Sequence, residues 1–132
     1  MEKNKNLKES TIKRIFLVIG FLVIAAAIFI FWGGNRIAKN TQVNKIDVYS
    51  KADGVYHGSY TISPVYVELD VTIKDKKITD IKILKHTNGI GFRAEGPVIK
   101  AIIDKQSNDV DIVSGASVSS KAIMGAVWDA LK

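Results

Sequence analysis

The sequence predicts an α+β domain, in which a small antiparallel sheet is covered by two helices, preceded by one N-terminal transmembrane helix. Three observations lead to this fold class. Residues 15–34 carry no charge, residues 65–73 alternate between apolar and polar side chains, and two segments after residue 96 repeat apolar residues with helical spacing. A strand with one apolar face needs a cover, and a helix with an apolar side supplies it.

The apolar run from Ile15 to Gly34 is long enough to cross a membrane. As a helix rising about 1.5 Å per residue, it matches a hydrocarbon core of roughly 30 Å. A cleaved signal peptide is the alternative, but its apolar region would be shorter and would end at a small-residue cleavage site. Five cations and two carboxylates lie in residues 1–14, whereas only Arg36 and Lys39 follow the run closely. This asymmetry predicts a single-pass anchor in the cell membrane, with the N-terminus in the cytoplasm and the C-terminal domain extracytoplasmic.

The composition excludes several kinds of chemistry. The chain has no cysteine and only two histidines, which excludes disulfides and thiolate sites and argues against a histidine-built metal site. The net charge of +6 is shared equally between the two sides of the predicted anchor, so we expect no nucleic-acid partner. The predicted parts are a cytoplasmic basic tail (1–14), a transmembrane anchor (15–34), a polar linker (35–51) and an extracytoplasmic domain (52–132).

Three strands are predicted at the start of the domain. The segment Asp53–Ile62 is rich in valine, tyrosine and threonine, which favour strands. The alternating segment Val65–Ile73 is the clearest strand, with one buried and one wet face. A turn at Lys74–Lys77 leads into a third strand, Ile78–His86, so the last two strands are expected to form an antiparallel hairpin.

Two helices are predicted to cover the sheet. The first has Pro97 in its opening turn, where a helix tolerates proline, and ends near Lys105. The second begins around Ser119 and places its apolar residues on one stripe. Within it, Gly125 weakens the helix slightly and indicates close packing against a neighbour.

The stretch "DIVSGASVSSKAI", Asp111–Ile123, gathers small and hydroxyl-bearing residues just before the last helix. The first turn of a helix presents unpaired N–H groups with a partial positive charge. Gly115 and Ala116 would let a ligand approach the backbone, which is typical of a phosphate-sized anion site. The added donors would be the hydroxyls of Ser114, Ser117, Ser119 and Ser120. Helix capping is the alternative, because serine is a preferred N-cap residue, and the residues alone leave both interpretations open.

From about Asp53 to Lys132 the chain resembles the FMN-binding domain of extracytoplasmic flavoproteins, which include subunits of sodium-pumping and related membrane oxidoreductases. The flavinylation signature of that family reads aspartate, two variable residues, serine or threonine, glycine, alanine and threonine. "DIVSGAS" follows it from Asp111 to Ala116 and departs only at its last position, Ser117. The segments "DGVYHGSY", "KHTNGIG" and "SSKAIMGAVWDAL" also resemble the family.

The resemblance implies that FMN is the cofactor and that it is attached covalently at Ser117. In the family the last residue of the signature can carry FMN through a phosphoester, which a flavin transferase makes from FAD with magnesium. Serine keeps the nucleophilic hydroxyl that this reaction needs. The resemblance also implies that Asp111 assists the transferase or its magnesium. The predicted cofactor-binding residues are Ser117, Ser114, Gly115, Ala116, Val118, Ser119, Ser120, Asp111, His86, Gly89 and Gly91.

In the family the loop that begins at His86 lies near the flavin ring. The resemblance therefore implies that His86 donates or accepts a hydrogen bond at the ring, and that Gly89 and Gly91 bring backbone donors to the flavin carbonyls. A surface histidine at the end of a strand and ordinary turn glycines are the alternatives.

The combined interpretation is a membrane-anchored, extracytoplasmic electron-transfer carrier rather than a stand-alone enzyme. Its expected partners are the flavin transferase during maturation, a membrane reductase or quinol as electron donor, and an exported redox acceptor. Two other functions stay open. One is a non-redox module that binds a phosphorylated small molecule, and the other is a scaffold subunit of a membrane complex.

Overall fold

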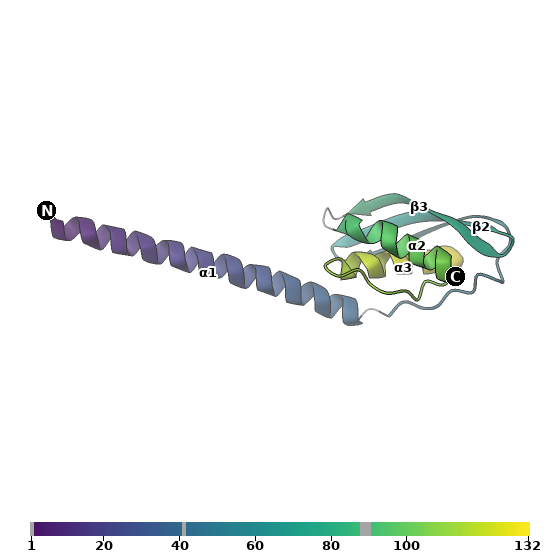
Figure 1. The fold of residues 1–132 in the computed structure, drawn as a ribbon, viewed down its shortest axis with the longest axis horizontal. Coiled ribbons are helices and arrows are strands. Elements are labelled where there is room, and N and C mark those ends of the chain that lie inside the picture. The colour runs from purple at the N-terminus through teal and green to yellow at the C-terminus, as the bar shows by residue number, and fades with distance from the viewer. Residues whose placement is uncertain (1, 41, 88–90) are drawn as a thin grey trace. The chain divides into compact units, whose positions relative to one another are not determined.

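The computed structural model describes residues 2–40, 42–87 and 91–132, and they form two compact units that divide at Gly34. Each unit is described by itself, and residues 35–132 are called the C-terminal unit. The elements in chain order are α1 (Glu2–Asn40), β1 (Gly54–Ile62), β2 (Val65–Lys74), β3 (Lys77–Thr87), the 3₁₀ helix η1 (Gly91–Ala94), α2 (Glu95–Lys105) and α3 (Ser117–Leu131), as Figure 1 shows.

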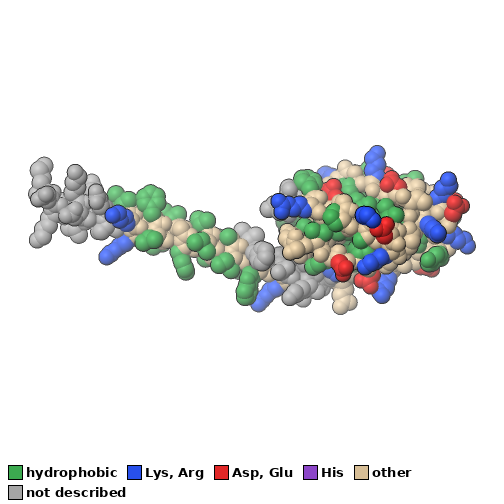
Figure 2. Space-filling model, viewed as in Figure 1, with side chains coloured by type: hydrophobic (Ala, Val, Ile, Leu, Met, Phe, Trp, Pro, Cys, Tyr) green, Lys and Arg blue, Asp and Glu red, His purple; other side chains and the backbone are tan. Residues whose placement is uncertain are grey.

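Helix α1 includes the whole apolar run that the sequence marks as an anchor. Its segment Thr11–Phe29 is long and apolar enough to cross a membrane. Large apolar side chains such as Phe16, Leu17 and Phe21 are exposed on it, and Figure 2 shows hydrophobic side chains along its described part. A helix with exposed apolar residues on all sides suits lipid better than water.

The three strands form one antiparallel sheet in the order β1, β2, β3. Apolar and polar side chains alternate along β2 as the sequence predicts. One face of the strand is buried, and the other is only partly covered. The buried residues of β2 are Val65, Val67, Leu69, Val71 and Ile73. Helix α3 packs against β1 and β2, and α2 packs against β3, so both helices cover the same face of the sheet (Figure 1). The predicted α+β fold class is confirmed.

Helix α3 crosses β1 at very short range because each element has a glycine at the crossing. A Cβ atom added to Gly58 of β1 would collide with the backbone of Ala126, and one added to Gly125 of α3 would lie 2.5 Å from the ring of Tyr60. The close packing that the sequence indicates at Gly125 is therefore confirmed. This contact positions the whole of α3, including its N-terminal end.

The predicted linker, 35–51, has two structural parts. Helix α1 continues through its first residues to Asn40, and residues 43–51, called the strap, lie against the rest of the C-terminal unit. Val48 of the strap is buried in the core. Asn108, which is 2% exposed, accepts a hydrogen bond from the Ile46 N–H at 3.2 Å and donates to the carbonyls of Asn44 at 2.8 Å and Met124 at 3.3 Å. One buried amide thus joins the strap to α3.

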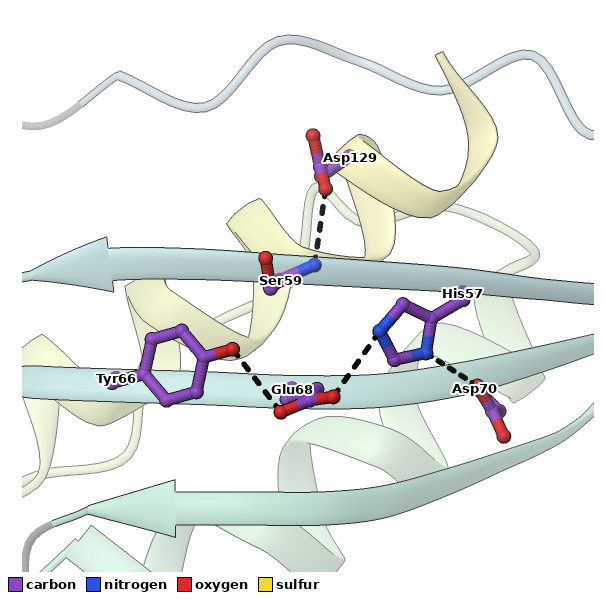
Figure 3. Close-up of polar contacts among 6 residues, drawn as sticks. All are labelled: His57, Ser59, Tyr66, Glu68, Asp70 and Asp129. Carbon is purple, nitrogen blue, oxygen red and sulfur yellow. Dashed lines mark hydrogen bonds and ion pairs between the residues drawn. The ribbon is translucent and has the colours of Figure 1, made fainter.

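The face of the sheet opposite the helices carries a row of polar side chains (Figure 3). His57 of β1 lies between two carboxylates of β2, with Nδ1 2.9 Å from Asp70 and Nε2 3.3 Å from Glu68. The Tyr66 hydroxyl donates to Glu68 at 3.1 Å. The hydrogen bond to Asp70, together with the charges of Asp70 and Glu68, raises the pKa of His57 above 6.5.

Replacing Asn108 with alanine should destabilise the C-terminal unit by about 1–3 kcal/mol, since it leaves strap and α3 backbone groups unpaired inside the fold. Thermal or denaturant unfolding of the full chain in detergent measures the effect. Asp109→Ala is the matched control, because it removes only the exposed Lys45–Asp109 ion pair, which should be worth about 0–1 kcal/mol. Equal losses in the two variants would contradict the role of Asn108.

The raised pKa of His57 makes the stability of the C-terminal unit depend on pH. A group whose pKa is higher in the folded state stabilises the fold fully below its unfolded pKa, and this contribution is lost as the pH rises through the folded pKa. His57→Gln should therefore lower the melting temperature most near about pH 5.5 and least near about pH 9. Melting curves of both proteins across this range test it, and a difference that does not change with pH would contradict it.

Candidate phosphate-binding site

The signature segment forms a tight turn directly before α3. The N–H of Ala116 donates to the carbonyl of Val113 at 3.0 Å, and Gly115 between them has a φ of +78°. This left-handed conformation favours glycine. A Cβ atom added to Gly115 would meet nothing within 4 Å, so the outer side of the turn is open to a ligand.

Helix α3 starts with uncapped amides. Its N-cap residue is Ala116, and within the described residues no side chain makes a capping hydrogen bond there. The first helical amide with an internal acceptor is that of Ser120, which donates to the Ala116 carbonyl at 2.9 Å. The amides of Ser117, Val118 and Ser119 lie before it, in the first turn, where a helix offers no acceptor. Within the described residues, capping by a serine, the alternative interpretation, is therefore wrong. Uncapped amides in the first turn of a helix are the groups that anion sites use.

The four serines have different environments. Ser114 is exposed in the turn and Ser117 is partly buried, whereas Ser119 and Ser120 are buried. The Ser120 hydroxyl donates to the Ala116 carbonyl at 2.9 Å and accepts from the Val113 N–H at 3.0 Å. Ser120 thus holds the turn in shape from inside, and Ser114 and Ser117 are the serines that keep exposed surface.

His86 is brought to this turn by an irregularity in β3. The register with β2 shifts so that Ile83 pairs with Leu69 and Lys85 pairs with Glu68, which leaves Leu84 as an extra residue. Beyond this bulge the inward positions of β3 move by one residue. His86, the partner of the inward-facing Val67, therefore points toward the helices, and its side chain is 1% exposed. The interpretation of His86 as a surface residue is wrong.

The His86 ring links two helices through both of its nitrogens. Nδ1 lies 2.6 Å from Oε1 of Glu95 in α2, and Nε2 lies 3.1 Å from Oγ of Ser119 in α3. An ionised carboxylate only accepts hydrogen bonds, so Nδ1 carries a proton that it donates to Glu95. The ring also makes an edge contact with Phe92, with the centroids 5.4 Å apart.

Gly91 closes this cluster from the side of η1. It is buried, and a Cβ atom at this position would collide with the Ser119 hydroxyl and lie 3.0 Å from Nε2 of His86. Glycine is required here by close contact rather than by an unusual backbone conformation. The predicted role of Gly89 lies outside the described residues, so it stays a prediction.

The structure thus brings most of the predicted residues together at one end of α3. The turn and the first helical residues are Ser114, Gly115, Ala116, Ser117, Val118, Ser119 and Ser120, and His86 and Gly91 lie against Ser119. Asp111 is exposed in the loop just upstream. The roles in cofactor binding that the sequence assigns to these residues stay predictions.

Glu95 and Phe92 both contact His86 but are not among the residues predicted from the sequence. Both lie in "HTNGIGFRAEG", residues 86–96, which extends from the predicted glycine-bearing loop into α2. A carboxylate nine residues from a histidine in a connection rich in turn residues is a usable signal, because a buried histidine needs a polar partner.

Comparison with known proteins points to the same family as the flavinylation signature does. The family model described as the FMN-binding domain matches residues 63–132, which is more than half of the chain. A protein of Vibrio harveyi named NADH:acrylate oxidoreductase is 36% identical over 63 residues, which are 46% of this chain and 6% of that protein. An uncharacterized protein of Treponema pallidum (strain Nichols) is 37% identical over 78 residues, which are 57% of this chain and 21% of that protein. The chain therefore spans only a small part of either relative.

The residues at the start of α3 fit the phosphate group of FMN. Among the described residues the first-turn amides are uncapped, the outer side of Gly115 is open, and Ser114 and Ser117 keep exposed surface. A phosphate needs these features, namely convergent N–H donors and no side chain in the way.

Proposed function

Because this chain belongs to the FMN-binding domain family, we propose that it is a membrane-anchored flavoprotein that carries FMN outside the cytoplasm and relays electrons. The observation that most supports this proposal is the uncapped first turn of α3, directly after the flavinylation signature. Bound FMN would supply the redox chemistry, because a flavin accepts two electrons and releases them singly. The chain itself would bind the cofactor and orient it.

The proposed attachment point is the hydroxyl of Ser117. This residue is the last of the signature and the first of α3, and it is partly exposed. A flavin transferase would use FAD with magnesium as the donor of FMN. The Ser117 Oγ would bond to the phosphorus of the FMN half, the phosphoanhydride bond to AMP would break, and AMP would leave. The hydroxyl proton would pass to a base of the transferase or to water.

The proposed partners follow from the role of a tethered carrier. A membrane reductase or quinol would reduce the flavin, and an exported acceptor or second flavoprotein would oxidise it. The relative named NADH:acrylate oxidoreductase supports a redox role. The chain spans 6% of that protein, so the donor and the acceptor of this chain are part of the proposal and are not taken from that relative.

Ser117→Ala should abolish covalent flavin. Co-expression of the full chain with a flavin transferase should add one FMN to its intact mass and leave fluorescence on the denatured protein band, and both should vanish in this variant because the nucleophilic oxygen is gone. Ser114→Ala is the matched control, since Ser114 is the other serine of this segment with exposed surface, and it should keep the label. Ser117→Thr, which restores the family signature, should keep it as well.

A yellow protein whose flavin is lost on denaturation would show that the cofactor is bound without the ester. A colourless protein made with transferase and riboflavin present would contradict the flavoprotein proposal and favour a non-redox binding module.

The proposed topology places residues after the anchor outside the cytoplasm, because cations predominate before it. The chain lacks cysteine, so a single introduced cysteine reports its own location. Ser50→Cys should react with a membrane-impermeant thiol reagent in intact cells, whereas Ser10→Cys should react only after lysis. The reverse pattern would overturn the topology.

A further inference from the structure

A buried hydrogen-bonded chain ends at the proposed phosphate site, and the proposed attachment of FMN at Ser117 does not use it. It runs from Glu95, whose side chain is 28% exposed, through the 1% exposed His86 to Ser119. Three elements contribute one residue each, and Ser119 belongs to the same helical turn as Ser117. Burying polar side chains costs desolvation free energy, and hydrogen bonds offset that cost. The fold provides hydrogen bonds to all three of these side chains, which is a specific feature of it.

The direction of the hydrogen bond between Ser119 and His86 depends on the charge of the ring. In neutral His86 the proton is on Nδ1, facing Glu95, so Nε2 has only a lone pair and must accept the Ser119 hydroxyl proton. In protonated His86 the Nε2–H donates to Ser119 Oγ instead. Serine has one hydroxyl proton, so protonation of His86 releases that proton for another acceptor.

We propose that His86 is a positioning residue for the phosphate group, which takes up one proton from solvent when an anion binds at the first turn of α3. The imidazolium then places a positive charge one hydrogen bond away from that turn, and the Ser119 hydroxyl is freed to donate to an anionic acceptor. This inference rests on the proposed function in one respect, namely that the anion is the phosphate of FMN.

The groups that face His86 support this coupling. Glu95 of α2 presents a carboxylate to Nδ1 of His86, and it is the only ionisable side chain within ion-pair distance of His86 in the described ranges. Ser119 of α3 and Phe92 of η1 are uncharged, and Val67 of β2 is apolar. An anion at the first turn of α3 adds a second negative charge to an environment whose one described ion-pair partner is the Glu95 carboxylate, and attraction between opposite charges favours protonation of His86.

The chain is well suited to a direct test because it contains only two histidines, His57 and His86. The full chain in detergent, with ¹⁵N-labelled histidine, is titrated by NMR with and without FMN loaded by the transferase. The midpoint of the His86 signal should move to higher pH in the loaded protein, while that of His57, on the opposite face of the sheet, should not move. His57→Gln assigns the two signals.

Two variants separate this coupling from a purely structural role. Glu95→Gln keeps the hydrogen-bonding shape but removes the charge, and loading should still displace the His86 signal to higher pH in this variant, because the added anion causes the displacement. Ser119→Ala removes the freed hydroxyl while it leaves the ring in place, and it should reduce the displacement caused by loading. Equal His86 midpoints in loaded and unloaded wild-type protein would overturn the inference, even if the protein is yellow.

A second titration tests the same coupling without flavin. Inorganic phosphate is added to the unloaded chain, and it should displace the His86 signal in the same direction and leave His57 unchanged. A chain that takes up no flavin would overturn the proposed function, and this titration would still decide the coupling. An absence of displacement at His86 with phosphate in such a chain would overturn the inference as well.

Discussion

The backbone contact between α3 and β1 is the constraint on which the rest of the C-terminal unit depends. Gly58 and Gly125 let the helix lie closer to the strand than side chains would allow, and the ring of Tyr60 lies against Gly125. A helix is nearly rigid over a few turns, so fixing its middle also fixes its ends. The first turn of α3 is therefore held at one place relative to the sheet, which a site made of backbone amides requires.

The candidate phosphate-binding site is assembled from groups that also hold the fold together. Ser120 shapes the turn, and Ser119 is bonded to His86. Within the described residues no buried side-chain nitrogen or oxygen lacks a hydrogen-bond partner. Because buried polar groups are costly when unpaired, the first turn, the end of β3 and the start of α2 are tied to one another. The unit can thus present uncapped amides on its outside without losing order beneath them.

The sequence predicted those parts of the structure that rest on local pattern. The alternation in β2, the hairpin with β3, and the close packing at Gly125 all follow from spacing or residue type, and the structure confirms them. The burial of His86 could not be predicted in this way. It depends on the extra residue at Leu84, which shifts the alternation of β3 by one position, and such a bulge leaves little trace in a single sequence. The same reason hides the partners Glu95 and Phe92, whose contacts exist only once His86 turns inward.

The strap changes where the C-terminal unit begins. By composition residues 43–51 are a polar connection, yet Val48 is a core residue and Asn108 is satisfied by the strap backbone. Chain length in such a segment is not free to vary, because an inserted residue would put Val48 and the Ile46 amide out of register with their partners. Insertions and deletions that change the length of chain between the anchor and the strap should therefore accumulate before residue 43. The strap itself should keep its length across relatives, as an internal strand of a sheet does.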